Sequence, residues 1–326
     1  MPTLVTGATG FLGRHLLSLL VGRGEPVRAL VRNPADAEEL RRLGVEVALG
    51  DALEAEVGRS ACDGCGLVYH LAGRVSHRRR DGALLRAANV ESVRTVLAAL
   101  EPGARLVHVS SVAAIGPAPG PEHAVDERHA FPPYAAGYPY AASKRAGEQL
   151  VLAAAGRGTD AVVANPGFLL GPGDVHRVST WHVESYLAGR LRFTAPGGLS
   201  NVDARDVAAG LVALAERGRA GERYILTSRD GNLAHGAFFR RLAEVTGVRH
   251  RMVALPRGLA LLAAGVPVSP VHRDEVEAAC NWWFYDPAKA ERELGFATRP
   301  LDETLAETAA AYRSAPSSNA FELLGR

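Results

Sequence analysis

The chain contains almost no lysine. Lys144 and Lys289 are the only two among 37 basic residues, and all the others are arginine. These residue types are not interchangeable, because lysine is a compact ammonium on a flexible stem and arginine is a wide planar fork. A lysine kept in such a background indicates a site that needs a small point charge.

Excess charge and long apolar runs are also missing. The net charge of +2 gives no electrostatic reason to expect nucleic acid or an acidic membrane as a partner. The longest apolar stretch, residues 258–271, is interrupted by Pro267 and Pro270 and is too short to span a bilayer. We therefore expect no membrane span and assign this stretch to an apolar wall of the protein. The first strand begins at Thr3, which leaves no room for a signal peptide.

Cysteine is scarce as well. Cys62 and Cys65 have C-x-x-C spacing, but a zinc site needs a second pair of ligands, and the one remaining cysteine, Cys280, does not supply it. A redox pair usually opens a helix after a strand, whereas this pair precedes an apolar run. We interpret all three as structural thiols of a protein in the reduced cytoplasm, and we expect no metal site.

Short apolar runs alternate with amphipathic stretches in the first half of the 326 residues. This alternation predicts an α/β fold with a doubly wound parallel sheet, the Rossmann arrangement. The runs of strand length lie at 3–6, 27–31, 45–49, 67–71, 106–110 and 161–164, and the longer stretches at 12–21, 83–100 and 141–155.

The second half is less regular and predicts a smaller, mixed domain. We assign residues 1–165 to a dinucleotide-binding domain, to which residues 202–227 return. Residues 166–201 and 228–314 form the predicted substrate-binding domain, and residues 315–326 a loose tail. Helical patterns lie at 207–217, 235–246, 274–280 and 287–294, and one strand pattern at 222–226.

Tyr140 and Lys144 are four residues apart in a predicted helix, so their side chains share one face. A phenol has an ordinary pKa of about 10. A nearby ammonium stabilises the phenolate and lowers that pKa, which makes the pair a candidate general acid/base. This spacing is common by itself, so an incidental pair on a surface helix is the alternative.

A glycine-rich turn follows the first predicted strand and opens the first helix. Glycines allow close approach of a pyrophosphate, and the helix N-terminus offers free N–H groups. The turn therefore predicts a dinucleotide site, with a tight turn of packing glycines as the alternative. Its predicted cofactor contacts are Gly7, Thr9, Gly10, Phe11, Leu12 and Gly13.

The G-x-x-G-x-x-G spacing together with Tyr140-x-x-x-Lys144 resembles the extended branch of the short-chain dehydrogenase/reductase superfamily. That branch includes nucleotide-sugar epimerases and dehydratases. The resemblance covers nearly the whole chain. Residues 221–226 and 289–295 are most similar to the dihydroflavonol-reductase-like and hopanoid-associated sugar-epimerase group. The resemblance implies an NAD(P)-binding enzyme with a small-molecule substrate, and a homodimer is one assembly it allows.

Further motifs extend the resemblance and imply cofactor contacts. Asp51 and Ala52 follow the third strand, where the family contacts adenine. His70 ends the fourth strand, and the next residues match the family loop beside the cofactor; they are Leu71, Ala72 and Gly73. Pro166 and Gly167 match its segment beside the nicotinamide.

The resemblance also implies the catalytic residues. Tyr140 would transfer the proton, and Lys144 would lower its pKa and bind the ribose. Ser111 would position the substrate oxygen, with Ser110 as the alternative because either serine could simply end the strand. Asn89 would support the relay.

The end of the second strand indicates the cofactor. An acidic residue there would bind the ribose 2′-hydroxyl of NAD, but the sequence reads Leu30-Val31-Arg32-Asn33. Arg32 suits a phosphate, which it can bind through two hydrogen bonds. We predict NADP rather than NAD, with an arginine at a helix start and no ligand as the alternative.

These features predict an NADP-dependent oxidoreductase that transfers hydride between the nicotinamide and a carbonyl or alcohol carbon. A nucleotide-sugar epimerase with a retained NAD(P) is the first alternative. Asn165 stands against it, because sugar-nucleotide members often carry Arg there. A catalytically silent NADP-binding regulator is the second, although such proteins typically lose the tyrosine or the lysine. The substrate and the direction of the reaction stay open.

Two clusters have no assigned role. The basic run His77–Arg80 is either a solvated loop or a contact for a substrate phosphate or carboxylate. The aromatic run Trp282–Tyr285 is either core of the smaller domain or a stacking surface for the substrate.

Overall fold

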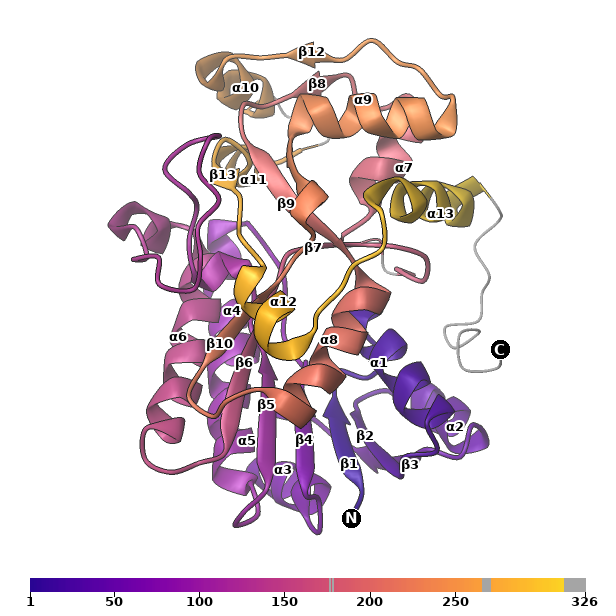
Figure 1. The fold of residues 1–326 in the computed structure, drawn as a ribbon, viewed down its shortest axis with the longest axis vertical. Coiled ribbons are helices and arrows are strands. Elements are labelled where there is room, and N and C mark those ends of the chain that lie inside the picture. Colours follow the sequence, from indigo (N-terminus) through magenta and orange to yellow (C-terminus); the bar gives the residue numbers. More distant parts are fainter. Residues whose placement is uncertain (176, 178, 266–270, 314–326) are drawn as a thin grey trace.

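The main sheet has seven parallel strands in the order β10-β6-β5-β4-β1-β2-β3 (Figure 1). The structure, a computed structural model, describes residues 1–175, 177, 179–265 and 271–313. The strand order reverses between β1 and β4, and ligands of such sheets bind at this point, outside the carboxyl ends of the strands. The strands are β1 (Thr3–Thr6), β2 (Val27–Val31), β3 (Glu46–Leu49), β4 (Leu67–His70), β5 (Arg105–Val109), β6 (Ala161–Pro166) and β10 (Arg223–Leu226).

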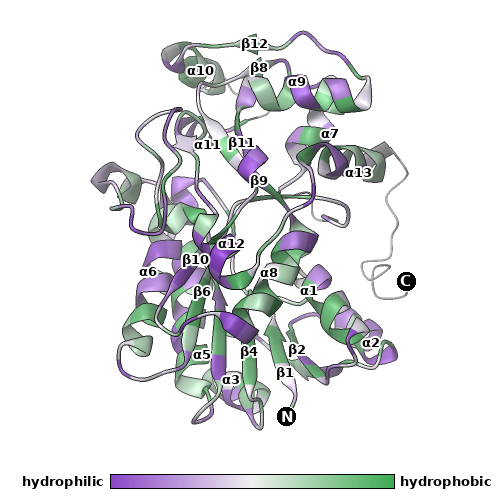
Figure 2. Cartoon of the chain, in the orientation of Figure 1, coloured by the Kyte–Doolittle hydropathy of each residue, from purple (hydrophilic) through white to green (hydrophobic). Residues whose placement is uncertain are grey.

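Helices cover both faces of this sheet, and an apolar layer fills each side. Successive strand residues point to opposite faces, so Val5 packs in one layer and Leu4 in the other. Strands buried on both faces read as continuous apolar runs, which Figure 2 shows in colour. The first layer contains α1 (Phe11–Gly22) and α8 (Ala204–Arg217), and the second α3 (Ala55–Cys62), α5 (Ser92–Ala99) and α6 (Pro139–Ala155). The predicted α/β fold with a doubly wound parallel sheet is therefore confirmed.

A smaller sheet is built around β9 (Gly198–Asp203). It pairs with β7 (Phe168–Leu170), β11 (Asn232–Ala234) and β13 (Trp282–Trp283). Beside it, α7 (Trp181–Leu187), α9 (His235–Thr246) and α13 (Leu301–Arg313) share one apolar cluster. The same region contains α10 (Arg257–Ala264), α11 (Arg273–Ala279) and the pair β8 (Phe193–Thr194) and β12 (Val253–Ala254). Helix α12 (Ala288–Leu294) instead packs on α8 and β10 of the main sheet. The domain boundaries given above stay a prediction.

The predicted helix over 83–100 is not regular. It begins as α4 (Gly82–Arg86), passes through a π-helical turn, η2 (Ala87–Glu91), and continues as α5. The predicted tail, 315–326, lies outside the described residues. In the part of the chain that is described, no helix combines the length and the apolar character that crossing a membrane requires.

The aromatic run Trp282–Tyr285 is mostly core. Trp283, Phe284 and Tyr285 are buried, and the Tyr285 hydroxyl donates to the carbonyl of Gly116 at 2.9 Å. Trp283 and Tyr285 pack with the residues after β5, so this core joins the late chain to the main sheet. Only Trp282 is partly exposed.

Candidate active site

The predicted site residues converge at the carboxyl ends of β1, β4, β5 and β6. Parallel strands place these ends along one edge of the sheet, which is why segments far apart in sequence meet there. Ser111 follows β5, and Tyr140 and Lys144 lie in the first turns of α6. Asn89 reaches the same place from the π-helical turn η2.

The glycine turn fits a pyrophosphate because two of its glycines leave no room for a side chain. A Cβ on Gly13 would lie 2.1 Å from the carbonyl oxygen of Gly7, and one on Gly7 would lie 2.7 Å from the backbone nitrogen of Ala72. Gly10 caps α1 without a side-chain hydrogen bond, so the first turn presents N–H groups to an anion. This close packing is the physical basis on which the turn could hold a dinucleotide.

The loop 71–73 is tied to this turn through Thr6 and His70. The Thr6 hydroxyl accepts from the backbone of Ala72 at 3.2 Å and hydrogen-bonds Nδ1 of His70 at 2.8 Å. Full burial lowers the pKa of His70 to about 3, and the positive charge of Lys144 contributes. His70 is therefore a neutral structural residue that fixes the loop, and sequence reasoning missed the part of Thr6.

Arg32 and Asp51 lie side by side at the ends of β2 and β3. Their side chains approach to 3.6 Å, and that of Arg32 is 79 % exposed. Asn33 caps helix α2 (Pro34–Arg42), with its side chain accepting from Ala35 at 3.0 Å. Arg32 thus forms an ion pair with Asp51 but is exposed to a ligand, while Asn33 after it begins the helix.

Tyr140 faces Ser111 and His77. The side chain of Ser111 is close enough to Tyr140 to act on the pKa of its phenol, while Oγ of Ser110 is buried without a partner among the described residues. The rings of Tyr140 and His77 meet edge to face, with centroids 5.9 Å apart. The geometry thus brings Ser111 rather than Ser110 to the phenol, and it adds His77 of the basic run His77–Arg80, for which no contact with Tyr140 was predicted.

The expected lowering of the phenol pKa is wrong for this structure. Burial raises the pKa of Tyr140, and the nearby side chain of Ser111 offsets this only in part. Lys144 does not reach the phenol; its Nζ donates to the carbonyl of Val109 at 3.0 Å. Desolvation disfavours the charged phenolate, and it determines the direction of the pKa shift because no ammonium contacts the phenol to offset it. Tyr140 therefore stays protonated near neutral pH.

Lys144 is a buried cation. Burial lowers the pKa of its ammonium to about 8, and the carboxylate of Glu148, one helical turn further along α6, acts in the opposite direction. Glu148 is itself buried and accepts from Asn165 at 2.7 Å and from Arg223 at 3.0 Å. Lys144 thus lies one helical turn from Glu148, which is part of a network of buried polar groups.

Asn165 has a structural task in this network. Its amide nitrogen donates both to Glu148 and to the backbone carbonyl of Ser111, the latter at 2.9 Å. It therefore holds the end of β5 where Ser111 emerges. This contact gives a physical reason for an amide at a position where sugar-nucleotide members often carry Arg.

Asn89 connects three parts of the site. Its amide nitrogen donates to the carbonyl of Arg74 and to the hydroxyl of Ser143, both at 3.0 Å, and its oxygen accepts from the backbone of Arg74 at 2.8 Å. Ser143 in turn donates to the carbonyl of Tyr140 at 2.8 Å. A Cβ on Gly73 would lie 2.8 Å from the Asn89 oxygen and 3.4 Å from Nζ of Lys144. Such π-helical turns are frequent at functional sites.

Pro166 ends β6, and Gly167 follows it next to the smaller sheet. A Cβ on Gly167 would lie 2.5 Å from the carbonyl oxygen of Ser200 in β9, so packing alone requires a glycine here. The following segment returns to the cofactor side, where the carbonyl of Pro172 hydrogen-bonds Nε2 of His15 in α1 at 3.0 Å.

The run His77–Arg80 makes a contact that neither interpretation predicted. The backbone nitrogen of Arg79 donates to Asp274 at 2.9 Å, and its guanidinium pairs with Glu277 at 2.8 Å, both in α11. His77 is solvent-exposed, although the protein atoms around it lower its pKa. The run therefore fastens the loop after β4 to α11, and it holds His77 against Tyr140.

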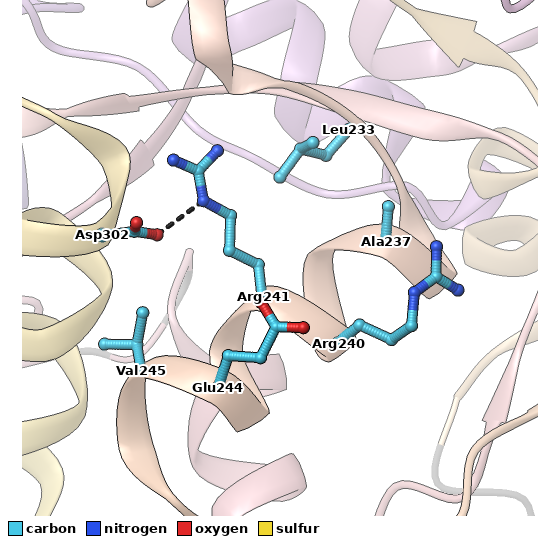
Figure 3. A pocket seen from close by; sticks show the side chains of 7 residues that line it. All are labelled: Leu233, Ala237, Arg240, Arg241, Glu244, Val245 and Asp302. Carbon is cyan, nitrogen blue, oxygen red and sulfur yellow. Dashed lines mark hydrogen bonds and ion pairs between the residues drawn. The ribbon is translucent and has the colours of Figure 1, made fainter.

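Two surface cavities lie away from these residues. One of about 490 Å³ lies between α9 and α13, where Arg241 pairs with Asp302 (Figure 3). The other, of about 830 Å³, lies along α6, β10 and α12 and has charged walls of both signs. Neither is lined by a predicted catalytic or cofactor residue. The described residues also contain no group of three or more metal-ligating side chains.

Residues 3–226 match the family described as NAD dependent epimerase/dehydratase family. The chain is 36 % identical to sterol demethylase protein B of Methylococcus capsulatus over 80 % of this chain and 81 % of that protein. It is also 36 % identical to 4-hydroxy-2-methyl-3-oxo-4-farnesyl-3,4-dihydroquinoline-1-oxide ketoreductase of Stigmatella aurantiaca, over 92 % of each. A solved nucleoside-diphosphate-sugar epimerase from Pseudomonas aeruginosa superimposes with a TM-score of 0.77 at 27 % identity, over 96 % of this chain and 97 % of that one.

The chain therefore belongs to the NAD-dependent epimerase/dehydratase family, the extended short-chain dehydrogenases/reductases. It is an NAD(P)-dependent oxidoreductase with a small-molecule substrate. The predicted family is thus confirmed. The individual site residues and the preference for NADP stay predictions.

Proposed function

We propose that the protein is an NADPH-dependent ketoreductase that reduces the carbonyl group of an apolar substrate to an alcohol. The observation that carries this proposal is a phenol kept protonated by burial, with Ser111 as the polar side chain that acts on its pKa. A protonated Tyr140 at neutral pH starts the reaction as an acid, which is the role that carbonyl reduction needs.

The proposed roles follow from the contacts. The bound cofactor supplies the hydride to the carbonyl carbon. The Ser111 hydroxyl donates to the carbonyl oxygen and orients it, and Tyr140 gives that oxygen its proton as the alcohol forms. Lys144, whose Nζ donates to the carbonyl of Val109 and does not contact the phenol, would bind the ribose of the cofactor. Asn89 links the loop after β4 to Ser143 of α6 and so holds these two segments together.

The relatives support a lipophilic substrate. One is named a sterol demethylase protein, and the other a ketoreductase of a farnesylated quinoline oxide. The epimerase alternative rests on the similarity to the Pseudomonas protein, and Asn165 replaces the arginine that many sugar-nucleotide members carry.

One assay tests the proposal. Purified protein is incubated with NADPH and a panel of sterol ketones, prenylated ketones, simple aldehydes and nucleotide sugars, and NADPH absorbance is followed. We expect steady consumption with at least one apolar ketone and formation of the alcohol. Interconversion of sugar epimers without net consumption of NADPH would establish the epimerase instead.

Arg32→Ala is expected to weaken NADPH binding by about 10- to 100-fold, because a hydrogen bond to a charged group contributes about 1.5–3 kcal/mol. NADH lacks the phosphate, so its dissociation constant should stay within about threefold. Fluorescence titration with both cofactors measures this. Arg42→Ala is the matched control, since that arginine lies on α2 and pairs with Glu38 at 3.6 Å. Equal weakening of both cofactors would show that Arg32 does not contact the 2′-phosphate.

A further inference from the structure

Acidic residues are absent from two long segments that meet at one end of the molecule. The chain has 35 acidic residues in total, but residues 185–202 and 245–273 contain none. These segments supply β8, β12 and α10, which lie together at the end of the long axis opposite the N-terminus (Figure 1). These two segments therefore carry only positive charge, although the net charge of the chain is only +2.

The arginines of these segments are available to an anionic partner. Arg192, Arg249, Arg251 and Arg257 are exposed, and within the described residues none of them has a carboxylate partner. Arg190, by contrast, pairs with Glu184 at 3.1 Å.

Large apolar side chains are exposed between these arginines. Phe193 in β8 and Val253 in β12 are register partners, so they point to the same face of this two-stranded sheet. Phe193 is 56 % exposed and Val253 is 39 % exposed. An exposed aromatic ring beside an exposed aliphatic side chain is a feature of interaction surfaces.

Helix α10 follows β12 and exposes two of its leucines to solvent, whereas a helix that packs on its own protein usually buries its large apolar residues. Leu259 is 54 % and Leu262 69 % exposed, whereas the small Ala260 is buried. Leu259 and Leu262 are three residues apart and share one face. The expectation that residues 258–271 cover an apolar wall is therefore wrong for Leu259 and Leu262, which face outward, whereas Ala260 is buried and Leu261 partly buried.

We propose that this end of the molecule docks on an anionic lipid bilayer. The exposed arginines and apolar side chains of β8, β12 and α10 form the docking surface, here called the apical patch. The leucines and Phe193 enter the interface between headgroups and acyl chains, and the arginines contact lipid phosphates. This proposal stands apart from the assigned reaction and does not depend on it.

Charge decides between a bilayer and a second copy of the chain. A twofold dimer through the apical patch would place the same arginines of both copies close together, and the two segments themselves supply no carboxylate to offset them. Nucleic acid would meet the arginines but would leave the leucines without an apolar partner. An anionic bilayer satisfies both kinds of side chain.

The proposed orientation brings the site close to the membrane. Helix α10 packs on α11, and α11 holds Arg79 in the loop that places His77 against Tyr140. A lipophilic substrate leaving the bilayer would thus arrive on the side of the site that carries Tyr140. The main sheet would lie on the side of the molecule away from the membrane (Figure 1).

Vesicle co-sedimentation of the full chain tests the proposal. We expect at least about tenfold stronger binding to phosphatidylcholine vesicles that contain phosphatidylglycerol than to phosphatidylcholine alone, because each arginine near an anionic surface adds about a fivefold factor. Added salt should weaken the binding. Arg249→Gln/Arg251→Gln and Leu259→Gln/Leu262→Gln should each reduce it about tenfold or more. In a Phe193→Trp protein, brominated lipid should quench the fluorescence.

Exposed residues elsewhere provide matched controls. Leu84→Gln, at a leucine that is 51 % exposed on α4, and Arg41→Gln/Arg42→Gln on α2 should bind vesicles like the wild type. Circular dichroism checks that every variant is folded. The proposal is overturned if the wild type stays in the supernatant, or if the patch variants bind as well as it does. It is also overturned if the wild type is a dimer that Leu259→Gln/Leu262→Gln dissociates.

Discussion

Replacing Tyr140 by phenylalanine is expected to lower kcat by about 10²- to 10⁴-fold, the usual contribution of a positioned proton donor. The substitution keeps the ring that packs on His77 and removes only the hydroxyl that meets Ser111. Single-turnover oxidation of NADPH measures the effect on the chemical step. The dissociation constant of the cofactor should change by less than about threefold, since a proton transferred at the substrate does not contribute to cofactor affinity.

Tyr138 provides the matched control. It lies just before α6, and its hydroxyl accepts from Asn281 at 2.9 Å instead of facing Ser111. Tyr138→Phe removes one such contact, worth about 1 kcal/mol of stability, and should leave kcat within a few fold. If Tyr140→Phe kept more than a tenth of the wild-type kcat, another group would have to supply the proton.

Lys144→Met is expected to lower kcat by about 10²-fold or more and to change how stability depends on pH. Burial lowers the pKa of Lys144 in the folded protein to about 8, from an ordinary 10.5. The gap between these pKa values corresponds to about 3 kcal/mol. The folded protein without cofactor therefore bears the cost of a buried cation at pH 7.

The sign of the pH effect follows from proton binding. Between about pH 8 and 10.5 the unfolded chain keeps the proton on Lys144 that the folded chain has released. Folding stability rises with pH wherever the unfolded state binds more protons. The difference in the free energy of unfolding between the wild type and Lys144→Met should thus change by about 3 kcal/mol in favour of the wild type as the pH rises through this window. Below pH 8 this difference should be constant.

Urea unfolding of both proteins at several pH values measures this gain. Lys289→Met is the control for activity, because the other lysine pairs with Glu222 at 2.7 Å on the outer side of β10 and should leave kcat unchanged. A parallel pH dependence of wild type and Lys144→Met would show that Lys144 is not desolvated as the structure indicates.

Local patterns predicted much of the fold and the meeting of the site residues. β1 and β2 have the predicted bounds, because buried parallel strands are continuous apolar runs that end at glycine or polar residues. Tyr140 and Lys144 share a helix face, as their spacing requires. The order of strands in a doubly wound sheet then places the ends of β1, β4 and β5 together.

Features that depend on distant segments could not be predicted. The pKa of Tyr140 rises because of the atoms that surround it, and helix spacing carries no information on those atoms. Arg79 reaches α11, whose residues follow it by nearly two hundred positions. The apical patch was hidden by the net charge, since a sum over the chain does not reveal that two acid-free segments fold to one place.

The π-helical turn that carries Asn89 amounts to one extra residue inserted into a helix. Deleting Ala88 would let the segment from Gly82 to Ala99 become a regular α-helix, which is far more common in proteins than a helix with a π-helical turn. Each residue of a helix turns the chain by about 100°, so the deletion would rotate Asn89 away from Arg74 and Ser143. The site thus depends on the number of residues in this helix as strictly as on the identity of Asn89. Deletion of a single residue would abolish activity even though all of the predicted catalytic side chains were retained.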